Sequence, residues 1–221
     1  MKATYKKHIL NFKRPSGTSR GVMTEKETWF LLLEDNGKIG VGECGLLRGL
    51  SVDDRPDYEE KLQWVCQNIH LGKDNLWNEL LEFPSLQFGV EMAFMSLEAE
   101  TPFKLFPSDF IKGKEAITIN GLVWMGEEAF MKQQIEEKLD DGFTCIKLKI
   151  GAIDFQQELD LLAFIRKHFD EKTIEIRVDA NGAFSPDEAL EKLQLLSKYQ
   201  LHSIEQLIKA GQFEAMRVLC E

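Results

Sequence analysis

The sequence has no uninterrupted apolar run long enough to cross a bilayer, and its opening segment, MKATYKKHILNFKRP, lacks the apolar region of a secretion signal. We therefore expect a cytoplasmic protein with no membrane partner. Basic residues are also few, because 27 Lys and Arg stand against 37 Asp and Glu, a net charge of −10. Such a surface repels phosphate backbones, which argues against a nucleic-acid partner.

Recognisable metal, redox and dinucleotide motifs are absent as well. There is no CxxC pair, no histidine at zinc-ligand spacing and no HExxH. We interpret the cysteines as reduced, mostly buried thiols and the histidines as structural residues. The cysteines are Cys44, Cys66, Cys145 and Cys220, and the histidines are His8, His70, His168 and His202. No GxGxxG follows a predicted strand, which disfavours dinucleotide binding.

What the sequence does contain is an ordinary globular composition, with 43% hydrophobic and 29% charged residues. Strands are predicted up to about residue 43, with a hairpin over 28–43 because TWFLLLED and KIGVGE flank Asn36-Gly37. Residues 57–100 show apolar residues at helical spacing and are predicted to be helices. The segment 101–113 contains prolines and ends in glycine, so we predict a first α+β domain over residues 1–113.

Residues 114–221 are predicted to form a second domain of four successive strand–helix units. The units are AITINGLVW with EEAFMKQQIEEKLDDG, CIKLKIG with DFQQELDLLAFIRKHF, IEIRVDANG with SPDEALEKLQLLSKYQ, and SIEQLIK with GQFEAMRVLCE. This repeat predicts a parallel sheet, either in a (β/α) barrel or in an open doubly wound sheet. The third helix has the clearest start, with Ser185 as N-cap, Pro186 at the first position and Glu188 completing a capping box.

Ionisable residues alternate with apolar ones along three of these strands. Side chains of a strand point alternately to its two faces, so an apolar set that faces the helices leaves the ionisable set on the barrel side. On that side lie Lys147 and Lys149, then Glu175, Arg177, Asp179 and the uncharged Asn181, then Glu205. Lys149, Asp179 and Glu205 are separated by 30 and 26 residues, about one strand–helix unit each. We therefore expect these three side chains at equivalent strand ends.

Two carboxylates at one edge of a sheet are suitable ligands for Mg²⁺. A lysine that lies close to a second lysine and to a divalent cation is expected to have a lowered pKa and to act as a general base. Each motif also has a simpler interpretation. Lys147-Leu-Lys149 alone is typical of a solvated strand face, Asp179-Ala-Asn181-Gly182 of an Asx turn, and Glu205 of a surface residue. Their occurrence once per strand–helix unit favours the functional interpretation.

Together these residues resemble the muconate-lactonising-enzyme-like branch of the enolase superfamily. Lys147-Leu-Lys149 resembles the KxK motif of that branch, Asp179-Ala-Asn181 its DxN, and Glu205-Gln206 the start of its EQP, although Leu207 stands in place of proline. The amino-terminal hairpin and helices resemble its capping domain. The resemblance implies an α/β fold, with an α+β capping domain followed by the first half of a TIM-like (β/α) barrel.

Within that branch, the segment from Gly17 to Asp54 resembles o-succinylbenzoate synthases of the menaquinone pathway. This resemblance implies a lyase that carries out the Mg²⁺-dependent syn dehydration of a cyclohexadiene carboxylate, SHCHC, to o-succinylbenzoate through an enediolate. It also implies that residues 17–21 belong to a mobile lid, whereas the simpler interpretation is an ordinary glycine-containing loop.

The same resemblance implies a role for each site residue. Lys149 would remove the proton α to the carboxylate and help water to leave, while Lys147 would tune the pKa of Lys149 and contact the carboxylate. Asp179 and Glu205 would ligate Mg²⁺. The supporting residues would be Arg177 and Asn181.

The barrel of the family continues to a further acidic ligand and a further lysine, and neither occurs before Glu221. We therefore expect either a longer protein or a barrel completed by a second copy or a partner, and little or no activity from these residues alone. The alternatives are dipeptide epimerisation, N-acylamino acid racemisation or cycloisomerisation on the same scaffold, or an inactive fragment. Racemisation needs an acid or base on both faces of the substrate, whereas syn dehydration needs essentially one.

Overall fold

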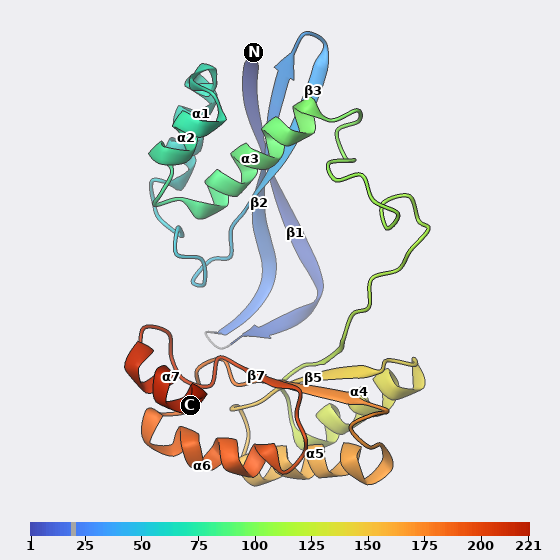
Figure 1. Cartoon of the computed structure of the whole chain (residues 1–221). Helices are drawn as coiled ribbons and strands as arrows, with labels where there is room; N and C mark the ends of the chain where they lie inside the picture. Colours follow the sequence, from blue (N-terminus) through green and yellow to red (C-terminus); the bar gives the residue numbers. More distant parts are fainter. Residues whose placement is uncertain (19–20) are drawn as a thin grey trace. The chain divides into compact units, whose positions relative to one another are not determined.

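The computed structural model describes residues 1–18 and 21–221, which form two compact units, Met1–Ala116 and Ile117–Glu221 (Figure 1). The boundary between the two units follows residue 116, whereas the domain boundary predicted from the sequence follows residue 113. Part of the predicted lid, Ser19 and Arg20, lies outside the described residues.

The first unit contains a three-stranded antiparallel sheet in the order β1-β2-β3. Its strands are β1 (Lys2–Thr18), β2 (Gly21–Asp35) and β3 (Lys38–Gly45). The hairpin between β2 and β3 turns at Asn36 and Gly37, whose φ angles of 48° and 78° are those of a tight primed turn, so the predicted hairpin is confirmed. Its helices are α1 (Tyr58–Gln67), α2 (Lys73–Glu79) and α3 (Pro84–Glu98), with a short 3₁₀ helix over Ile69–Leu71.

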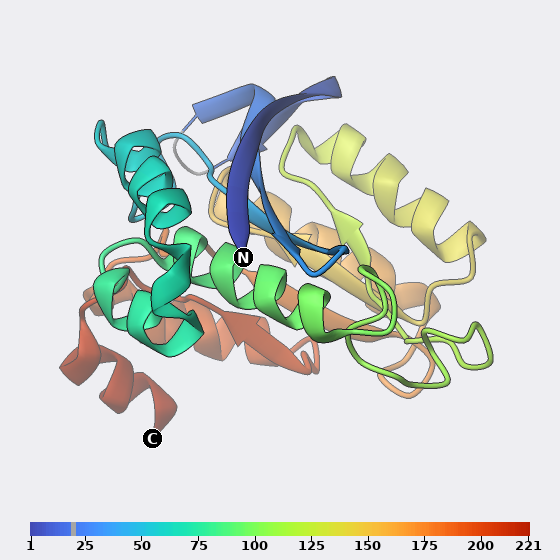
Figure 2. The same cartoon turned by 90° about the horizontal axis from the view of Figure 1, so that it is seen from above.

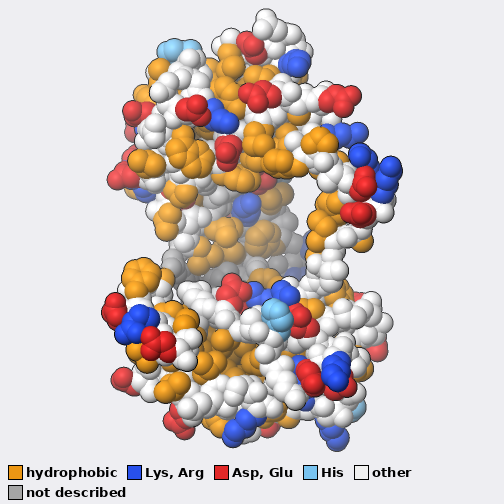
Figure 3. Space-filling view, viewed as in Figure 1, with side chains coloured by type: hydrophobic (Ala, Val, Ile, Leu, Met, Phe, Trp, Pro, Cys, Tyr) orange, Lys and Arg blue, Asp and Glu red, His pale blue; other side chains and the backbone are white. Residues whose placement is uncertain are grey.

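Helix α3 runs across one face of this sheet, as the two views in Figures 1 and 2 show. The face is apolar because alternate residues of β2, Trp29, Leu31 and Leu33, are fully buried against the helices. The segment that follows α3 has no regular secondary structure over residues 101–120 and exposes several large apolar side chains, among which Phe103 is 81% exposed. Figure 3 shows hydrophobic side chains at the surface along this segment.

The second unit is a four-stranded parallel sheet in the order β4-β5-β6-β7, in which each strand is followed by a helix. The predicted parallel repeat is therefore confirmed, and the unit forms the first half of a TIM-like barrel. The strands are β4 (Gly121–Val123), β5 (Cys145–Lys149), β6 (Glu175–Asp179) and β7 (Ser203–Glu205). The helices are α4 (Glu128–Asp140), α5 (Phe155–His168), α6 (Pro186–Ser197) and α7 (Phe213–Cys220).

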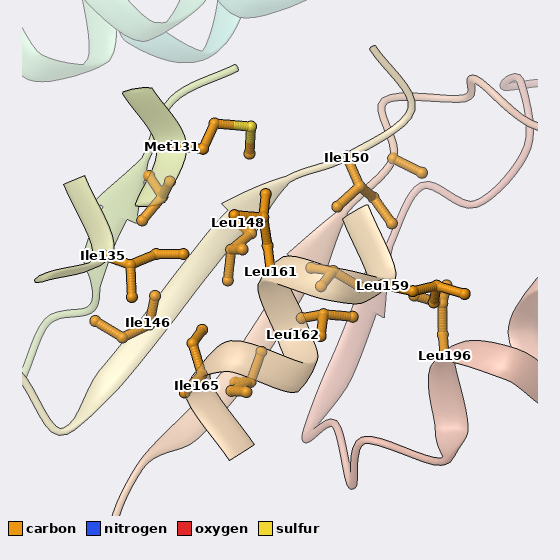
Figure 4. Close-up of a cluster of buried hydrophobic side chains, with 14 of the residues drawn as sticks. Met131, Ile135, Ile146, Leu148, Ile150, Leu159, Leu161, Leu162, Ile165 and Leu196 are labelled. Carbon is orange, nitrogen blue, oxygen red and sulfur yellow. The ribbon is translucent and has the colours of Figure 1, made fainter. Parts of the chain in front are cut away.

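The core of the second unit lies between its sheet and its helices. Ile146, Leu148 and Ile150 project from β5 and its end toward α5, where Leu162 and Ile165 meet them (Figure 4). All five side chains are at most 1% exposed. The apolar set therefore faces the helices as predicted, and the other face of the sheet is left to the ionisable set.

Two local predictions need correction. The first strand of the repeat was predicted over 116–124, but β4 spans only Gly121–Val123, because its pairing with β5 begins at Gly121. Ser185 precedes α6 and Pro186 begins it, as predicted, but the Ser185 hydroxyl makes no capping hydrogen bond to the helix. Its hydroxyl and its backbone N–H both interact with the carboxylate of Glu188, so the Glu188 half of the predicted capping box is present. Lys192 also approaches this carboxylate, at 2.6 Å. None of the helices in the described ranges is long and apolar enough to cross a membrane.

Candidate active site

The candidate site lies at the carboxyl ends of β5, β6 and β7. Lys149 is the register partner of Asp179, and Asp179 is the register partner of Glu205. The three residues thus lie side by side on neighbouring strands, as their spacing in the sequence predicts. This edge of a parallel sheet is where α/β proteins place their ligands.

Salt bridges and hydrogen bonds join these residues. The Lys149 ammonium donates to Oδ2 of Asp179 at 2.5 Å and to Oδ1 of Asn181 at 3.1 Å. Lys147 donates to Oε2 of Glu205, and its Nζ lies 3.6 Å from Oδ2 of Asp179. Two ammonium groups and two carboxylates therefore form one continuous ionic cluster, with Asp179 in contact with both lysines.

Burial differs sharply across the cluster. The side chain of Asp179 is 1% exposed and that of Glu205 is 61% exposed. Burial opposes the ionisation of Asp179, but the hydrogen bonds from Lys149 and from the backbone N–H of Asn181 outweigh it, so the pKa of Asp179 lies below its ordinary value. Asp179 is therefore a buried, ionised carboxylate at neutral pH.

Lys147, which is expected to tune the proposed base, has a pKa above its ordinary value. The hydrogen bond to Glu205 raises its pKa, and the charge of Asp179 adds to that effect, although partial burial opposes it. Here the nearest charges are two carboxylates, which stabilise the ammonium form.

The backbone turns sharply just beyond each carboxylate-bearing strand. Asn181 and Gln206 have φ angles of 48° and 45°, in the left-handed region that few side chains adopt. The N–H of Asn181 bonds to Oδ1 of Asp179 at 2.9 Å, so the Asx-turn interpretation of this motif also holds. Leu207, which replaces the proline of the EQP motif, is 4% exposed and packs in the core.

Arg177 does not join the cluster. Its guanidinium donates from Nε to Oε1 of Glu175 at 2.6 Å, and Cys145 and His202 are the other neighbours of the Glu175 carboxylate. These residues lie nearer the amino ends of the strands. Of the two predicted supporting residues, only Asn181 therefore contacts the proposed base.

One residue of structural importance was missed in the sequence. Glu158 of α5 is 1% exposed, and its Oε1 accepts backbone hydrogen bonds from the loop that follows Lys149. The available signal was periodicity, since Glu158 stands four and seven residues before the buried Leu162 and Ile165 and so lies on the apolar stripe of the helix. An acidic residue on such a stripe indicates a buried partner.

The donor set is chemically suited to Mg²⁺. Oδ2 of Asp179 and Oε2 of Glu205 both face the Lys147 ammonium, so two hard oxygen donors already converge on one positive charge. Mg²⁺ sites commonly use one or two carboxylates and complete the shell with water and substrate oxygens. Across residues 1–18 and 21–221, no group of three or more His, Cys, Asp or Glu side chains is arranged to hold a metal, so this site offers two protein carboxylates.

Comparison with known proteins gives consistent matches. Residues 130–221 match a family model described as enolase C-terminal domain-like. An o-succinylbenzoate synthase of Desulfotalea psychrophila is 41% identical over an alignment 251 positions long, which covers 100% of this chain and 68% of that protein. A hydrophobic dipeptide epimerase of Enterococcus faecalis is 32% identical over 93 residues, which cover 41% of this chain and 25% of the epimerase.

Solved structures agree with these matches. The crystal structure of MenC from Desulfotalea psychrophila superposes with a TM-score of 0.84 and 37% identity, covering 100% of this chain and 68% of that one. The o-succinylbenzoate synthase of Thermosynechococcus elongatus, solved with Mg in its active site, superposes with a TM-score of 0.78 at 20% identity, covering 100% and 65% of the two chains. The latter match shows a shared fold, and the present chain spans about two thirds of both structures.

Proposed function

This chain belongs to the enolase superfamily, and on that premise we propose that the protein is an o-succinylbenzoate synthase that dehydrates SHCHC to o-succinylbenzoate in menaquinone biosynthesis. The observation that carries the proposal is the ionic cluster in which Lys149, Asp179 and Glu205 are register partners at the strand ends. The 41% identity with a synthase over the whole chain supports it.

The proposed reaction removes a proton and a hydroxyl group from the same face of the substrate. Lys149, as the neutral amine, accepts the proton from the carbon α to the carboxylate, and the resulting ammonium returns a proton to the departing hydroxyl, which leaves as water. The C–H and C–O bonds break and a C=C bond forms, so no oxidant is needed. Lys147 keeps its positive charge and contacts the substrate carboxylate, in agreement with its raised pKa.

Asp179 and Glu205 are the residues of this chain that would hold Mg²⁺. The bound ion would supply positive charge beside the substrate carboxylate as electrons move onto it. Asp179 is well suited to this role because it stays ionised although it is 1% exposed. Asn181 accepts a hydrogen bond from Lys149 and so fixes the direction of the amine.

The alternative function is dipeptide epimerisation. The similarity to an Enterococcus faecalis epimerase over 93 residues supports this alternative. Both lysines of the cluster project from β5, so they approach a substrate from one side. Syn dehydration needs a base on that side alone, whereas epimerisation also needs an acid on the opposite side. The identity of 41% with a synthase over the whole chain, against 32% with the epimerase over 41% of it, supports dehydration better.

The experiment that tests the proposal uses a chimera in which residues 1–221 replace the matching segment of the Desulfotalea psychrophila synthase. We expect the chimera to convert SHCHC to o-succinylbenzoate when Mg²⁺ is present, with the product quantified by liquid chromatography. L-Ala-L-Glu and hydrophobic dipeptides are assayed in parallel by exchange of the α-proton for deuterium. A folded chimera that exchanges a dipeptide proton but does not dehydrate SHCHC would overturn the proposal.

A further inference from the structure

A single buried carboxylate holds the loop that follows β5. Oε1 of Glu158 accepts hydrogen bonds from the N–H groups of Gly151 at 2.6 Å, Ala152 at 3.2 Å and Ile153 at 3.5 Å. This loop begins two residues after Lys149. One oxygen atom of α5 therefore gathers three successive amides of the segment that leaves the proposed base.

The position of Glu158 is not explained by capping of its own helix. Asp154 already caps α5, because its side chain accepts from the N–H groups of Gln156 at 3.0 Å and Gln157 at 3.4 Å. Oε2 of Glu158 is buried and has no hydrogen-bond partner within the described residues, and burial raises the pKa of this carboxyl. An acid in such a place costs stability, and the contacts that offset the cost are those to the loop.

The loop in turn lies against the next loop of the site. Gly151 has a φ of 87°, and a Cβ at this position would lie 2.3 Å from Cβ of Ala183 and 3.3 Å from the carbonyl oxygen of Ala180. Ala180 and Ala183 belong to the segment that follows Asp179 and contains Asn181. The backbone of one loop therefore rests directly on the backbone of the other.

The contact continues to the third loop. A Cβ at Gly182 would lie 3.0 Å from Cα of Lys209, and the N–H of Gly182 bonds to the carbonyl oxygen of Gln206 at 2.7 Å. The loops after β5, β6 and β7 thus form one stack of backbones, which we call the loop stack: residues 151–153, 180–183 and 206–209. Glu158 fixes the first layer of this stack from the helix side.

We propose that Glu158 is a positioning residue, which sets the loop stack so that Lys149 meets Asp179 and Asn181 in one fixed arrangement. The role depends on Oε1 as an acceptor of three N–H groups. It deepens the proposed function and rests on it for its catalytic meaning, but the effect on Lys149 can be measured without any substrate.

The first test measures the reactivity of individual lysines in the 221-residue chain. Trace acetylation with acetic anhydride, read by mass spectrometry, gives the ratio of labelling at Lys149 to that at Lys147. In Glu158→Ala we expect this ratio to rise by roughly fivefold, which corresponds to the loss of about one hydrogen bond. We also expect faster hydrogen exchange of the backbone amides in residues 151–153. Glu158→Gln retains the acceptor oxygen and is expected to keep the wild-type ratio.

Asp154→Ala is the matched control, because it removes two N–H contacts from the same helix start but does not touch the loop. We expect Asp154→Ala to weaken α5 without changing the labelling ratio. If Glu158→Ala does not fold, Glu158→Asp is used instead, since its shorter side chain withdraws the carboxylate from the loop. An unchanged ratio in the folded Ala or Asp variant, or a Gln variant that behaves like Ala, would overturn the proposal.

The second test places Glu158→Ala in the active chimera. We expect kcat to fall while KM stays close to the wild-type value, because the base is displaced and substrate binding is not. A rise in KM with kcat unchanged would contradict the proposed role. A wild-type chimera without dehydratase activity would instead count against the proposed function, and the labelling ratios would still decide the role of Glu158.

Discussion

The ammonium of Lys149 lies 2.5 Å from Oδ2 of Asp179, across the register pair that joins β5 to β6. The proposed base and the proposed buried metal ligand therefore share one hydrogen bond. A change in the charge of either residue alters the surroundings of the other, so the two roles have to be separated by different measurements.

Replacing the proposed base removes turnover. In the chimera, Lys149→Ala is expected to lower kcat for SHCHC dehydration by about 10²–10⁴-fold, the usual contribution of a general acid–base group. The fold and Mg²⁺ binding should persist. Product formation is measured by liquid chromatography, with Lys172→Ala as the control because Lys172 is exposed in a turn away from the site. A Lys149→Ala chimera with unimpaired kcat would rule out the assignment.

Removing either carboxylate weakens Mg²⁺ binding. We expect Asp179→Asn and Glu205→Gln each to raise the Kd for Mg²⁺ in the chimera by about tenfold or more, or 1.4 kcal/mol, because each deletes one anionic oxygen ligand. Isothermal titration calorimetry measures the change. Glu191→Gln, an exposed acid on α6, is the matched control. Wild-type affinity in both substituted proteins would show that the ion binds elsewhere.

The stability of the second unit depends on pH through Asp179. Burial opposes its ionisation, but Lys149 and the Asn181 N–H hold its pKa in the folded chain below that of an unfolded aspartate, about 3.9. Its stabilising effect is thus fully present above about pH 4 and is lost as pH falls through the lower folded value. The gap in urea midpoint between wild type and Asp179→Asn should be largest near pH 7 and narrow below pH 4.

This pH experiment is run with a chelator so that metal ions do not contribute. Glu191→Gln should show no gap at any pH, since its carboxylate is exposed on α6. A gap between wild type and Asp179→Asn that widened toward acid pH would contradict the direction of the Asp179 shift.

The four thiols should react in an order set by burial. Cys220 is exposed, whereas Cys44 is 0% exposed and burial raises its pKa to about 12. At pH 8 only about one Cys44 thiol in ten thousand would be ionised. Iodoacetamide followed by mass spectrometry should therefore label Cys220 first and Cys44 only after unfolding. Cys220→Ser should remove the fast phase, and early labelling of Cys44 in the folded chain would contradict the burial of this thiol.

The fold could be predicted largely because its signals are local. Asn36-Gly37 specifies a hairpin by its own conformational preference, and the repeat of strand and helix patterns specifies a parallel sheet. The length of β4 was not predictable in this way, because Ile117 and Ile119 have strand-like sequence but no neighbouring strand in the described part of the chain, and are 60% and 67% exposed. The burial of Cys44 and Cys145 was predicted, and the exposure of Cys220 was not.

The candidate site also contains features that the sequence predicts and features that it does not. Alternation along β5 and β6, with the spacing between units, placed Lys149, Asp179 and Glu205 together, since both follow from strand geometry. The partner of Arg177 was not predictable from alternation, because a long side chain can reach either end of its strand, and here it reaches Glu175. The helical periodicity of α5 could have indicated that Glu158 is buried, but its partners are backbone amides, which no side-chain pattern identifies.

The loop stack has a consequence for altering the protein. Gly151 and Gly182 lack the side chains that would separate neighbouring backbones, so the three turns fit together only in their present shapes. A turn transplanted from a relative would have to arrive with its two neighbours and with an acceptor at position 158. Changes of specificity that leave these turns intact are therefore better sought in segments outside the stack than by exchanging one turn at a time.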